Sequence, residues 1–146
     1  GFFEEEYRKK VEQLQKEGIV RFYGFQEDPR PFYAQADCVV LPSYHEGMSN
    51  VLLEAAASGR AIITTDIPGC REAVDNGKSG MLCRVKSADS LYKAMKRFTE
   101  LSRDKREAIG KAGREKMEKE FDKNQVVEET VKVITGNRSK QERGRL

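Results

Sequence analysis

Three short apolar segments separated by helical patterns constrain the fold of this chain more than any other feature of its sequence. Residues 38–43 read CVVLPS, residues 61–66 read AIITTD, and residues 80–85 read GMLCRV. Strands that are apolar on both faces occur mainly in parallel sheets with helices on both sides. Because a helical pattern, NVLLEAAASG, separates the first two segments, the alternation indicates right-handed crossovers. We therefore predict a doubly wound α/β fold, with a parallel sheet and helices on both faces.

Further elements are predicted around these strands. Residues 3–17 have apolar side chains at helical spacing, and VRFYGF at 20–25 is β-branched and aromatic, so we predict a helix and then a fourth strand. PFYAQAD and REAVDNG are predicted as short helices. From Ser87 onward three helices should pack on the sheet, with Asp89 and Asp104 as N-caps of the first two. Their sequences are ADSLYKAMKRFTELS, DKREAIGKAGREKMEKEF and NQVVEETVKVI.

Composition places the chain among globular domains and excludes several classes of function. The net charge is +3, and lysines and glutamates are interleaved, so charge does not indicate a nucleic-acid partner. Three cysteines without a CxxC pair and a single histidine predict neither a disulfide framework nor a metal site. No apolar run approaches the roughly 20 residues that span a bilayer, and no signal-peptide pattern is present, so we expect a cytoplasmic location.

The chain is predicted to contain one domain and a tail. We expect the domain to cover residues 1–136 and to be followed by a basic, disordered tail at 137–146, because NRSKQERGRL offers no apolar anchors. The sequence opens GFFEEEYRKK, without methionine and inside a helical pattern. We therefore expect a piece of a longer protein, incomplete on its N-terminal side.

The loop SYHEGMSN at 43–50 is the predicted ligand site, because ligands of open parallel sheets bind beyond the carboxyl ends of the strands. Gly47 lets a ligand approach the backbone closely, and the free amides at the start of the helix at Ser49 favour an anion such as phosphate. Glu46 precedes these amides. An ionised carboxylate there suits hydroxyl donors or a developing positive charge.

A second carboxylate, Glu54, lies on the apolar helix that follows the loop. A buried carboxylate needs a partner, and a ribose diol would offer it two donors. Alternatively, Glu46 only complements the helix dipole while Glu54 pairs with Arg60 or Arg71. The residues alone leave both interpretations open.

The stretch from FYAQADCVVLPS to GKSGMLC resembles the donor-binding segment of the family 4 retaining glycosyltransferases of the GT-B fold. The mark of this family is a pair of glutamates separated by seven residues, here Glu46 and Glu54, with flanking PS, EG, LLEA, ASG and TD-x-PG motifs. The resemblance covers roughly residues 7–122. It implies the C-terminal, Rossmann-like domain of a two-domain enzyme, truncated here. That domain binds the nucleotide-activated sugar, and the N-terminal domain binds the acceptor.

The resemblance also implies roles for individual residues. Glu46, the candidate catalytic residue, would orient the sugar through its hydroxyls, and Glu54 would bind the ribose hydroxyls. The family's diphosphate-binding Arg and Lys lie on a portion missing from this chain, for which Arg71 and Lys78 are the local alternatives, both expected as surface residues. The other implied donor-binding residues are Gly47, Met48 and Ser49 through their amides, Asn50 at the helix start, His45 in the loop, and Gly24 and Phe25 beside the base.

The implied reaction moves a sugar from a UDP- or GDP-linked donor to an acceptor hydroxyl with retention at the anomeric carbon. The chain contains no DxD motif, which agrees with metal-independent catalysis without a cofactor. Bacterial polysaccharide or glycoconjugate synthesis is the implied context, with a glycan or lipid-linked acceptor and the full-length protein at the inner face of the membrane. Two alternatives stay open: a nucleotide-sugar 2-epimerase of the same fold and a non-catalytic binding or interaction domain. The fragment by itself is expected to be inactive as a transferase.

Overall fold

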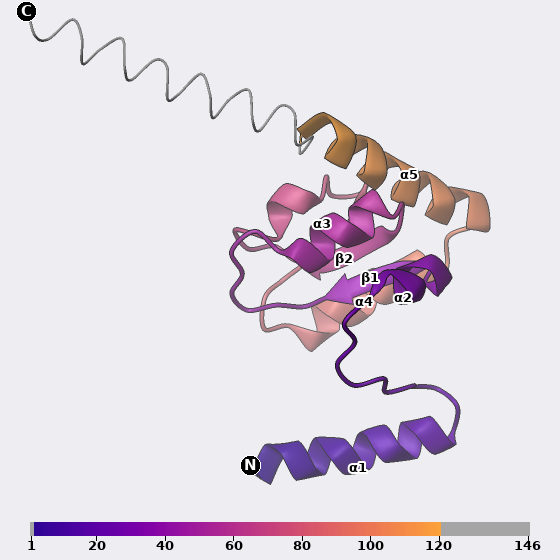
Figure 1. Cartoon of the computed structure of the whole chain (residues 1–146). Helices are drawn as coiled ribbons and strands as arrows, with labels where there is room; N and C mark the ends of the chain where they lie inside the picture. Colours follow the sequence, from indigo (N-terminus) through magenta and orange to yellow (C-terminus); the bar gives the residue numbers. More distant parts are fainter. Residues whose placement is uncertain (1, 121–146) are drawn as a thin grey trace, which may run out of the picture.

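A three-stranded parallel sheet, in the order β1-β2-β3, organises the molecule (Figure 1). The computed structural model describes residues 2–120. The strands are β1 (Cys38–Leu41), β2 (Ala61–Thr65) and β3 (Gly80–Cys83). The helices are α1 (Phe2–Lys16), α2 (Arg30–Gln35), α3 (Asn50–Ala57), α4 (Ala88–Thr99) and α5 (Arg103–Glu120), with a short 3₁₀ turn, η1 (Arg71–Ala73).

The central strand β2 forms the core of the sheet. All five of its residues are buried, and Ile63 pairs in register with Val40 of β1 and Met81 of β3. Continuous burial explains why this strand reads AIITT rather than alternating with polar residues, because both of its faces are covered. The predicted parallel α/β fold is therefore confirmed.

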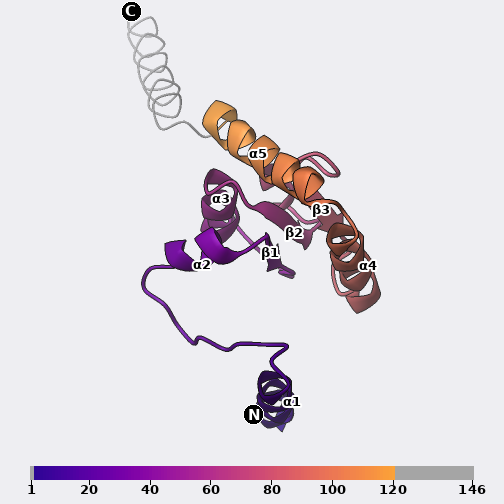
Figure 2. The ribbon, with the colours of Figure 1, turned by 90° about the vertical axis from the view of Figure 1, so that its right-hand side faces the viewer.

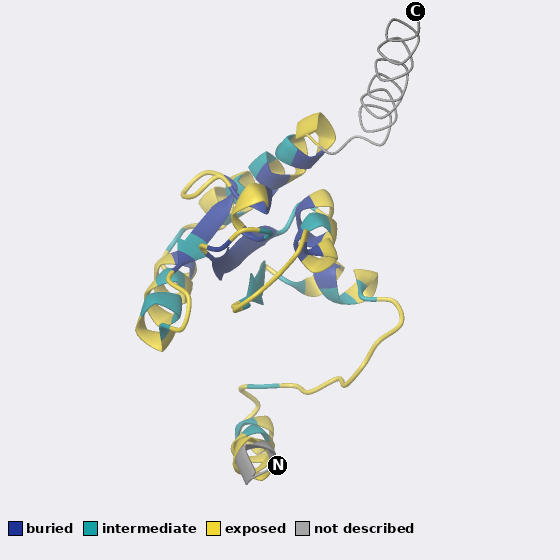
Figure 3. Ribbon diagram, turned by 90° about the vertical axis from the view of Figure 1, so that its left-hand side faces the viewer, coloured by how far each residue is buried: buried dark blue, intermediate teal, exposed yellow. Residues whose placement is uncertain are grey.

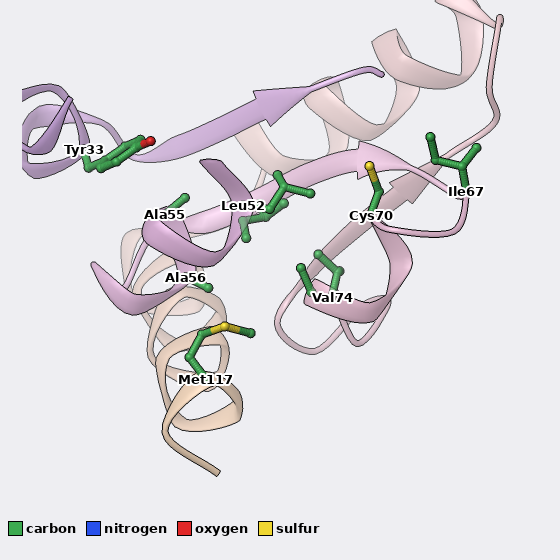
Figure 4. Close-up of a cluster of buried hydrophobic side chains, with 10 residues drawn as sticks. Tyr33, Leu52, Ala55, Ala56, Ile67, Cys70, Val74 and Met117 are labelled. Carbon is green, nitrogen blue, oxygen red and sulfur yellow. The ribbon is translucent and has the colours of Figure 1, made fainter. Parts of the chain in front are cut away.

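Helices cover both faces of the sheet (Figure 2). Ile62 packs in one cluster with Leu52 of α3 and Met117 of α5, part of which Figure 4 shows. Ile63, which points to the opposite face, packs with Phe98 of α4. Successive strand residues thus contact different helix layers, as the two-residue period of a strand requires.

The predicted fourth strand at residues 20–25 is wrong. The segment is not a strand and pairs with no strand of the described part of the chain, and Phe22 and Phe25 are 75% and 90% exposed. A strand is completed by hydrogen bonds to a neighbour, and β-branched and aromatic residues give the propensity without supplying that neighbour. Figures 1 and 3 show α1 and the exposed segment after it lying apart from the buried sheet.

Two predicted N-caps are also wrong, each by two residues. Ser87 caps α4, since its hydroxyl accepts a hydrogen bond from the amide of Ser90 at 3.2 Å, while Asp89 lies in the first turn. Asp104 likewise lies in the first turn of α5, behind Ser102, whose hydroxyl accepts from the amide of Lys105.

The other helix predictions have mixed outcomes. The short helix predicted from REAVDNG is reduced to the 3₁₀ turn η1, after which Val74 is extended. PFYAQAD and the first two helices after Ser87 are found as α2, α4 and α5. The predicted helix NQVVEETVKVI and the predicted tail at 137–146 lie outside the described residues.

Candidate functional site

The loop between β1 and α3 is fixed at its base by the end of β2. The buried Thr64 hydroxyl donates to the carbonyl oxygen of Leu41 at 2.7 Å, and the buried Thr65 hydroxyl donates to that of Ser43 at 2.6 Å. These bonds satisfy polar groups inside the core and hold the chain as it leaves the sheet. The loop therefore starts from a defined position at the carboxyl edge.

Gly69, which belongs to the loop after β2, fixes the middle of the loop between β1 and α3. Its φ of +86° is in the left-handed region, and a Cβ at this position would overlap the carbonyl oxygen of Gly47. The amide of Ser49 donates to the carbonyl oxygen of Gly69 at 3.4 Å, and the Glu72 carboxylate accepts from the Gly69 amide at 2.6 Å. Only glycine permits both this dihedral angle and this close approach. In the sequence, Gly69 stands out only as the last residue of the TD-x-PG motif, and its positioning role was not predicted.

The start of α3 presents backbone donors at this edge. Ser49 is the N-cap, buried to 5% exposure, and its side chain makes no capping hydrogen bond. The Leu52 amide donates to the Ser49 carbonyl oxygen, whereas the amides of Asn50 and Val51 have no acceptor among the described residues. Together with the positive end of the helix dipole, they form a place where an anion is stabilised. Gly47, Met48 and Asn50 are exposed beside it, and their donor-binding roles stay predictions. The Ser49 amide, also predicted to meet the donor, already donates to the carbonyl oxygen of Gly69.

Glu46 lies in the same loop and is exposed. Its carboxylate accepts a hydrogen bond from the Ser43 hydroxyl at 2.8 Å, a contact between residues three apart in the chain. This bond restrains the side chain while leaving most of its acceptor capacity free. Glu46 can therefore accept hydrogen bonds from hydroxyl groups next to the helix start.

Glu54 is exposed one turn further along α3 and has a protein partner that the sequence did not indicate. The hydroxyl of Tyr33, on α2, donates to its carboxylate at 3.2 Å. Burial raises the pKa of the Tyr33 hydroxyl, and the hydrogen bond to Glu54 raises it further, so the hydroxyl stays protonated at neutral pH. Tyr33 orients one carboxylate oxygen and leaves the carboxylate able to accept from a ligand diol.

The alternative pairing of Glu54 with arginine is wrong. Arg60 donates to the carbonyl oxygen of Ala36 at 3.1 Å. Arg71 forms an ion pair with Asp66 at 3.0 Å. Both guanidinium groups are directed elsewhere, so the carboxylate of Glu54 is free of a cationic partner among the described residues.

The remaining predicted residues are not all brought together. His45 lies exposed in the loop with Glu46. Gly24, with a φ of +66°, and Phe25 belong to the segment between α1 and α2, which Figures 1 and 2 show away from the loop before α3. Their predicted place beside the base remains a prediction.

Two cations at the carboxyl end of β3 were missed. Arg84 and Lys86 are exposed and line a hollow of about 310 Å³ with Tyr44 and Thr65. The Lys86 ammonium lies 5.9 Å from the centre of the Tyr44 ring, which belongs to the loop before α3. The carboxyl-end rule used for the loop applies equally to residues that follow β3 and would have found them.

Lys78 is in a different place from these cations. It precedes β3 and lies at the amino end of the strands, where it lines a separate hollow with Met81 and Arg97. Lys78 therefore cannot neutralise an anion at the start of α3.

No helix within residues 2–120 is long and apolar enough to cross a membrane. No cluster of three or more His, Cys, Asp and Glu side chains suited to holding a metal ion occurs in that same part.

Residues 3–100 match the family model of the glycosyl transferases group 1, and the chain belongs to this family. This confirms the family that the glutamate pair and its flanking motifs indicated. The retaining subtype stays a prediction. The match includes β1, α3, β2 and β3, and thus every strand of the described sheet.

Curated relatives agree with this membership. Over 117 residues the chain is 27% identical to the lipopolysaccharide core biosynthesis glycosyltransferase LpsE of Rhizobium meliloti, covering 80% of this chain and 34% of that protein. It is 29% identical over 137 residues to N-acetylgalactosamine-N,N'-diacetylbacillosaminyl-diphospho-undecaprenol 4-alpha-N-acetylgalactosaminyltransferase of Campylobacter jejuni, covering 93% and 37%. The chain thus spans about a third of the length of these relatives.

Solved structures share the fold. A sucrose-phosphate synthase from Thermosynechococcus elongatus matches with a TM-score of 0.76 and 25% identity, covering 92% of this chain and 35% of that one. Anabaena Alr3699/HepE in complex with UDP matches with a TM-score of 0.77 and 23% identity, covering 93% and 38%. The second similarity concerns the fold alone. Both neighbours support the Rossmann-like sheet as part of a GT-B glycosyltransferase fold.

Proposed function

We propose that this domain binds a nucleotide diphosphate sugar and that the complete protein transfers the sugar to an acceptor hydroxyl with retention. The observation that carries the proposal is the placement of two exposed carboxylates, Glu46 and Glu54, on either side of a helix start with free backbone amides. The amides suit the diphosphate, and the carboxylates suit hydroxyl groups. One donor molecule contains both kinds of group.

In this proposal Glu46 orients the sugar and stabilises the positive charge that develops at its anomeric carbon. The amides at the start of α3 stabilise the charge on the departing diphosphate, an electrostatic role that needs no metal ion. Lys86 and Arg84, on the same edge, add positive potential. We infer metal-independent transfer without a cofactor, which the absence of a DxD motif in the sequence supports.

Glu54 binds the ribose diol in this proposal. Tyr33 holds one of its oxygens at 3.2 Å and thereby limits the rotation of the side chain before the donor arrives. Orientation before binding reduces the entropy lost on binding. Glu54 therefore contributes to affinity, while Glu46 contributes mainly to the reaction.

The names of the relatives support a biological setting. The Rhizobium relative is named for lipopolysaccharide core biosynthesis, and the Campylobacter relative for a diphospho-undecaprenol-linked acceptor. We therefore propose a cytoplasmic enzyme of bacterial polysaccharide or glycoconjugate synthesis, working on a glycan or lipid-linked acceptor at the inner face of the membrane. These transferase names favour transfer over the 2-epimerase alternative, and the Anabaena complexes with UDP and UDP-glucose support a uridine donor.

Calorimetric titration of the chain with UDP-glucose, and with a GDP-linked sugar, tests donor binding. We expect Glu54→Gln to weaken binding by about tenfold or more, because a hydrogen bond to a charged group contributes about 1.5–3 kcal/mol and 1.4 kcal/mol is a factor of ten. Glu12→Gln, an exposed glutamate of α1, is the matched control and should bind like the parent.

Transfer by the complete protein is tested separately. Glu46→Gln should abolish sugar transfer while changing donor affinity much less. Equal affinity of the parent chain and Glu54→Gln would refute the ribose assignment, and full transfer by Glu46→Gln would refute the catalytic one.

A further inference from the structure

A second hollow lies at the opposite edge of the sheet from the loop before α3. It has a volume of about 650 Å³ and is bounded by the end of α2, the Gly59–Arg60 turn before β2, and one side of α5. In Figure 1 the arrow of β1 points away from α2, so this hollow lies at the amino ends of the strands. We call it the basic pocket.

The lining of the basic pocket is strongly cationic. Five of its residues are arginine or lysine and two, Asp37 and Glu107, are acidic, which leaves a formal charge of +3 on the lining. Concentrated positive charge around a concave surface attracts anions. The cations are Arg60, Arg103, Arg106, Lys111 and Arg114.

Only part of this charge is neutralised by the protein. Arg103 pairs with Glu107 at 2.7 Å, and Arg114 pairs with Glu118 at 3.0 Å. Within residues 2–120, Arg106 and Lys111 form no ion pair. Arg60 donates one guanidinium hydrogen bond to the carbonyl oxygen of Ala36 and has no carboxylate partner in that part of the chain.

Two buried donors in this lining lack an acceptor. The Nε atoms of Arg60 and Arg106 are both inaccessible and have no hydrogen-bond partner among the described residues. Because these two atoms are enclosed, a ligand in the basic pocket would meet the terminal nitrogens of the same guanidinium groups, whose side chains are only partly buried. The guanidinium group is the side chain whose planar donor geometry matches phosphate oxygens best.

The walls of the basic pocket are held together by backbone contact. A Cβ at Gly110 of α5 would overlap the carbonyl oxygen of Gly59, and Gly110 is fully enclosed by this packing. The turn that carries Arg60 and the helix that carries Arg106 are therefore fixed relative to each other. Arginine groups that are fixed before a ligand arrives lose less freedom on binding it.

We propose that the basic pocket binds a phosphate group, with the guanidinium groups of the partly buried Arg60 and Arg106 as donors and the exposed Lys111 as the cation at the rim. The carbonyl oxygen of Ala36 accounts for one bond of Arg60, and Arg106 and Lys111 form no ion pair within residues 2–120. This site is separate from the donor site and does not depend on it. The phosphate belongs either to a small soluble anion or to the headgroup of an anionic lipid.

Calorimetric titration of the full chain with inorganic phosphate and with diphosphate tests the soluble source. Arg106→Gln should weaken binding about tenfold and Lys111→Gln a few-fold, because charge-assisted hydrogen bonds are about twice as strong as neutral ones. Lys93→Gln, on exposed α4, is the matched control. Circular dichroism establishes that each variant is folded, and the exposed Lys111 provides a second test that does not disturb packing.

Co-sedimentation with phosphatidylcholine vesicles, with and without phosphatidylglycerol, tests the lipid source. Binding only to the anionic vesicles, reduced in Arg106→Gln and Lys111→Gln but not in Lys93→Gln, identifies a headgroup. Binding of soluble phosphate with the same pattern identifies a soluble ligand. Binding by neither route, or binding that both pocket variants leave unchanged, would overturn the proposal; unchanged phosphate binding would place the anion at the start of α3 instead.

Discussion

The carboxyl ends and the amino ends of the strands, here called the carboxyl edge and the amino edge, each carry a candidate site, and the two sites differ in the groups they present. At the carboxyl edge a helix begins, so backbone amides are free and carboxylates stand beside them. At the amino edge α2 ends, so carbonyl oxygens are free, and Arg60 donates to that of Ala36. The helix α5 begins at the same edge with Arg103, so the helix ends alone do not account for the cations gathered there. The lining of the basic pocket has a formal charge of +3, and this excess positive charge distinguishes the amino edge from the carboxyl edge.

At each edge a glycine lies close to the carbonyl oxygen of another segment and so keeps two segments of the site together. Gly69 approaches Gly47 at the carboxyl edge, and Gly110 approaches Gly59 at the amino edge. A side chain at either position would separate two segments that together form one site. The two glycines allow each edge to be disturbed independently of the other.

The largest effect is expected from Gly69→Ala. The new methyl group would overlap the Gly47 carbonyl oxygen, and alanine disfavours a φ of +86°. Overpacking costs about 1–3 kcal/mol and the strained dihedral about 1–3 kcal/mol more, so we expect the free energy of unfolding to fall by about 3 kcal/mol. Urea denaturation measures this change. Binding of UDP-glucose should be lost while phosphate binding at the basic pocket persists, and retained donor affinity would contradict the positioning role.

Gly110→Ala should have the next largest effect. Its methyl group would push α5 away from the Gly59 carbonyl oxygen, and we expect this overpacking to lower the free energy of unfolding by about 2 kcal/mol. The higher helix propensity of alanine acts in the opposite direction, so overpacking is the only source of the loss. Phosphate binding should weaken, while the affinity for UDP-glucose should be unchanged. Equal loss of both ligands in a folded variant would show that the two edges are coupled rather than independent.

Tyr33→Phe should have the smallest effect. It removes the hydrogen bond to Glu54, so we expect the free energy of unfolding at pH 7 to fall by about 1 kcal/mol. Donor binding should become a few-fold weaker. The raised pKa of Tyr33 favours the protonated hydroxyl in the folded state, so its contribution is complete at neutral pH and declines as the pH rises above about 10. Denaturation midpoints measured across alkaline pH should fall less steeply for the variant, and identical slopes would contradict this account.

The core strands could be predicted from the sequence because they consist of consecutive apolar residues, a pattern typical of strands covered on both faces. AIITT is buried at all five positions, and the half-buried CVVL packs against the clusters on both faces of the sheet. VRFYGF has similar propensity and failed, because a strand also requires a neighbour and propensity does not provide one. The caps were misplaced by two residues since serine and aspartate are both good N-caps and only geometry selects between them.

The candidate site was predicted in part for a similar reason. Glu46 and Glu54 were found because they belong to a local pattern in one loop and one helix. Tyr33 contacts Glu54 from 21 positions away, and the requirement for Gly69 arises from a contact with a different loop. The basic pocket combines residues from α2, from α5 and from the turn before β2, so no local sequence pattern predicts it.

The backbone contact at Gly69 has a consequence for how donor preference can diverge. Main-chain atoms of Gly69 hold Ser49 and Gly47 in place, so the position of the helix start does not depend on the exposed side chains of Tyr44, His45 and Met48. Substitutions at those three positions can reshape the surface that meets the sugar without moving the amides. They are therefore the sites at which evolution, or a combinatorial library, can change sugar selectivity at little expense in stability.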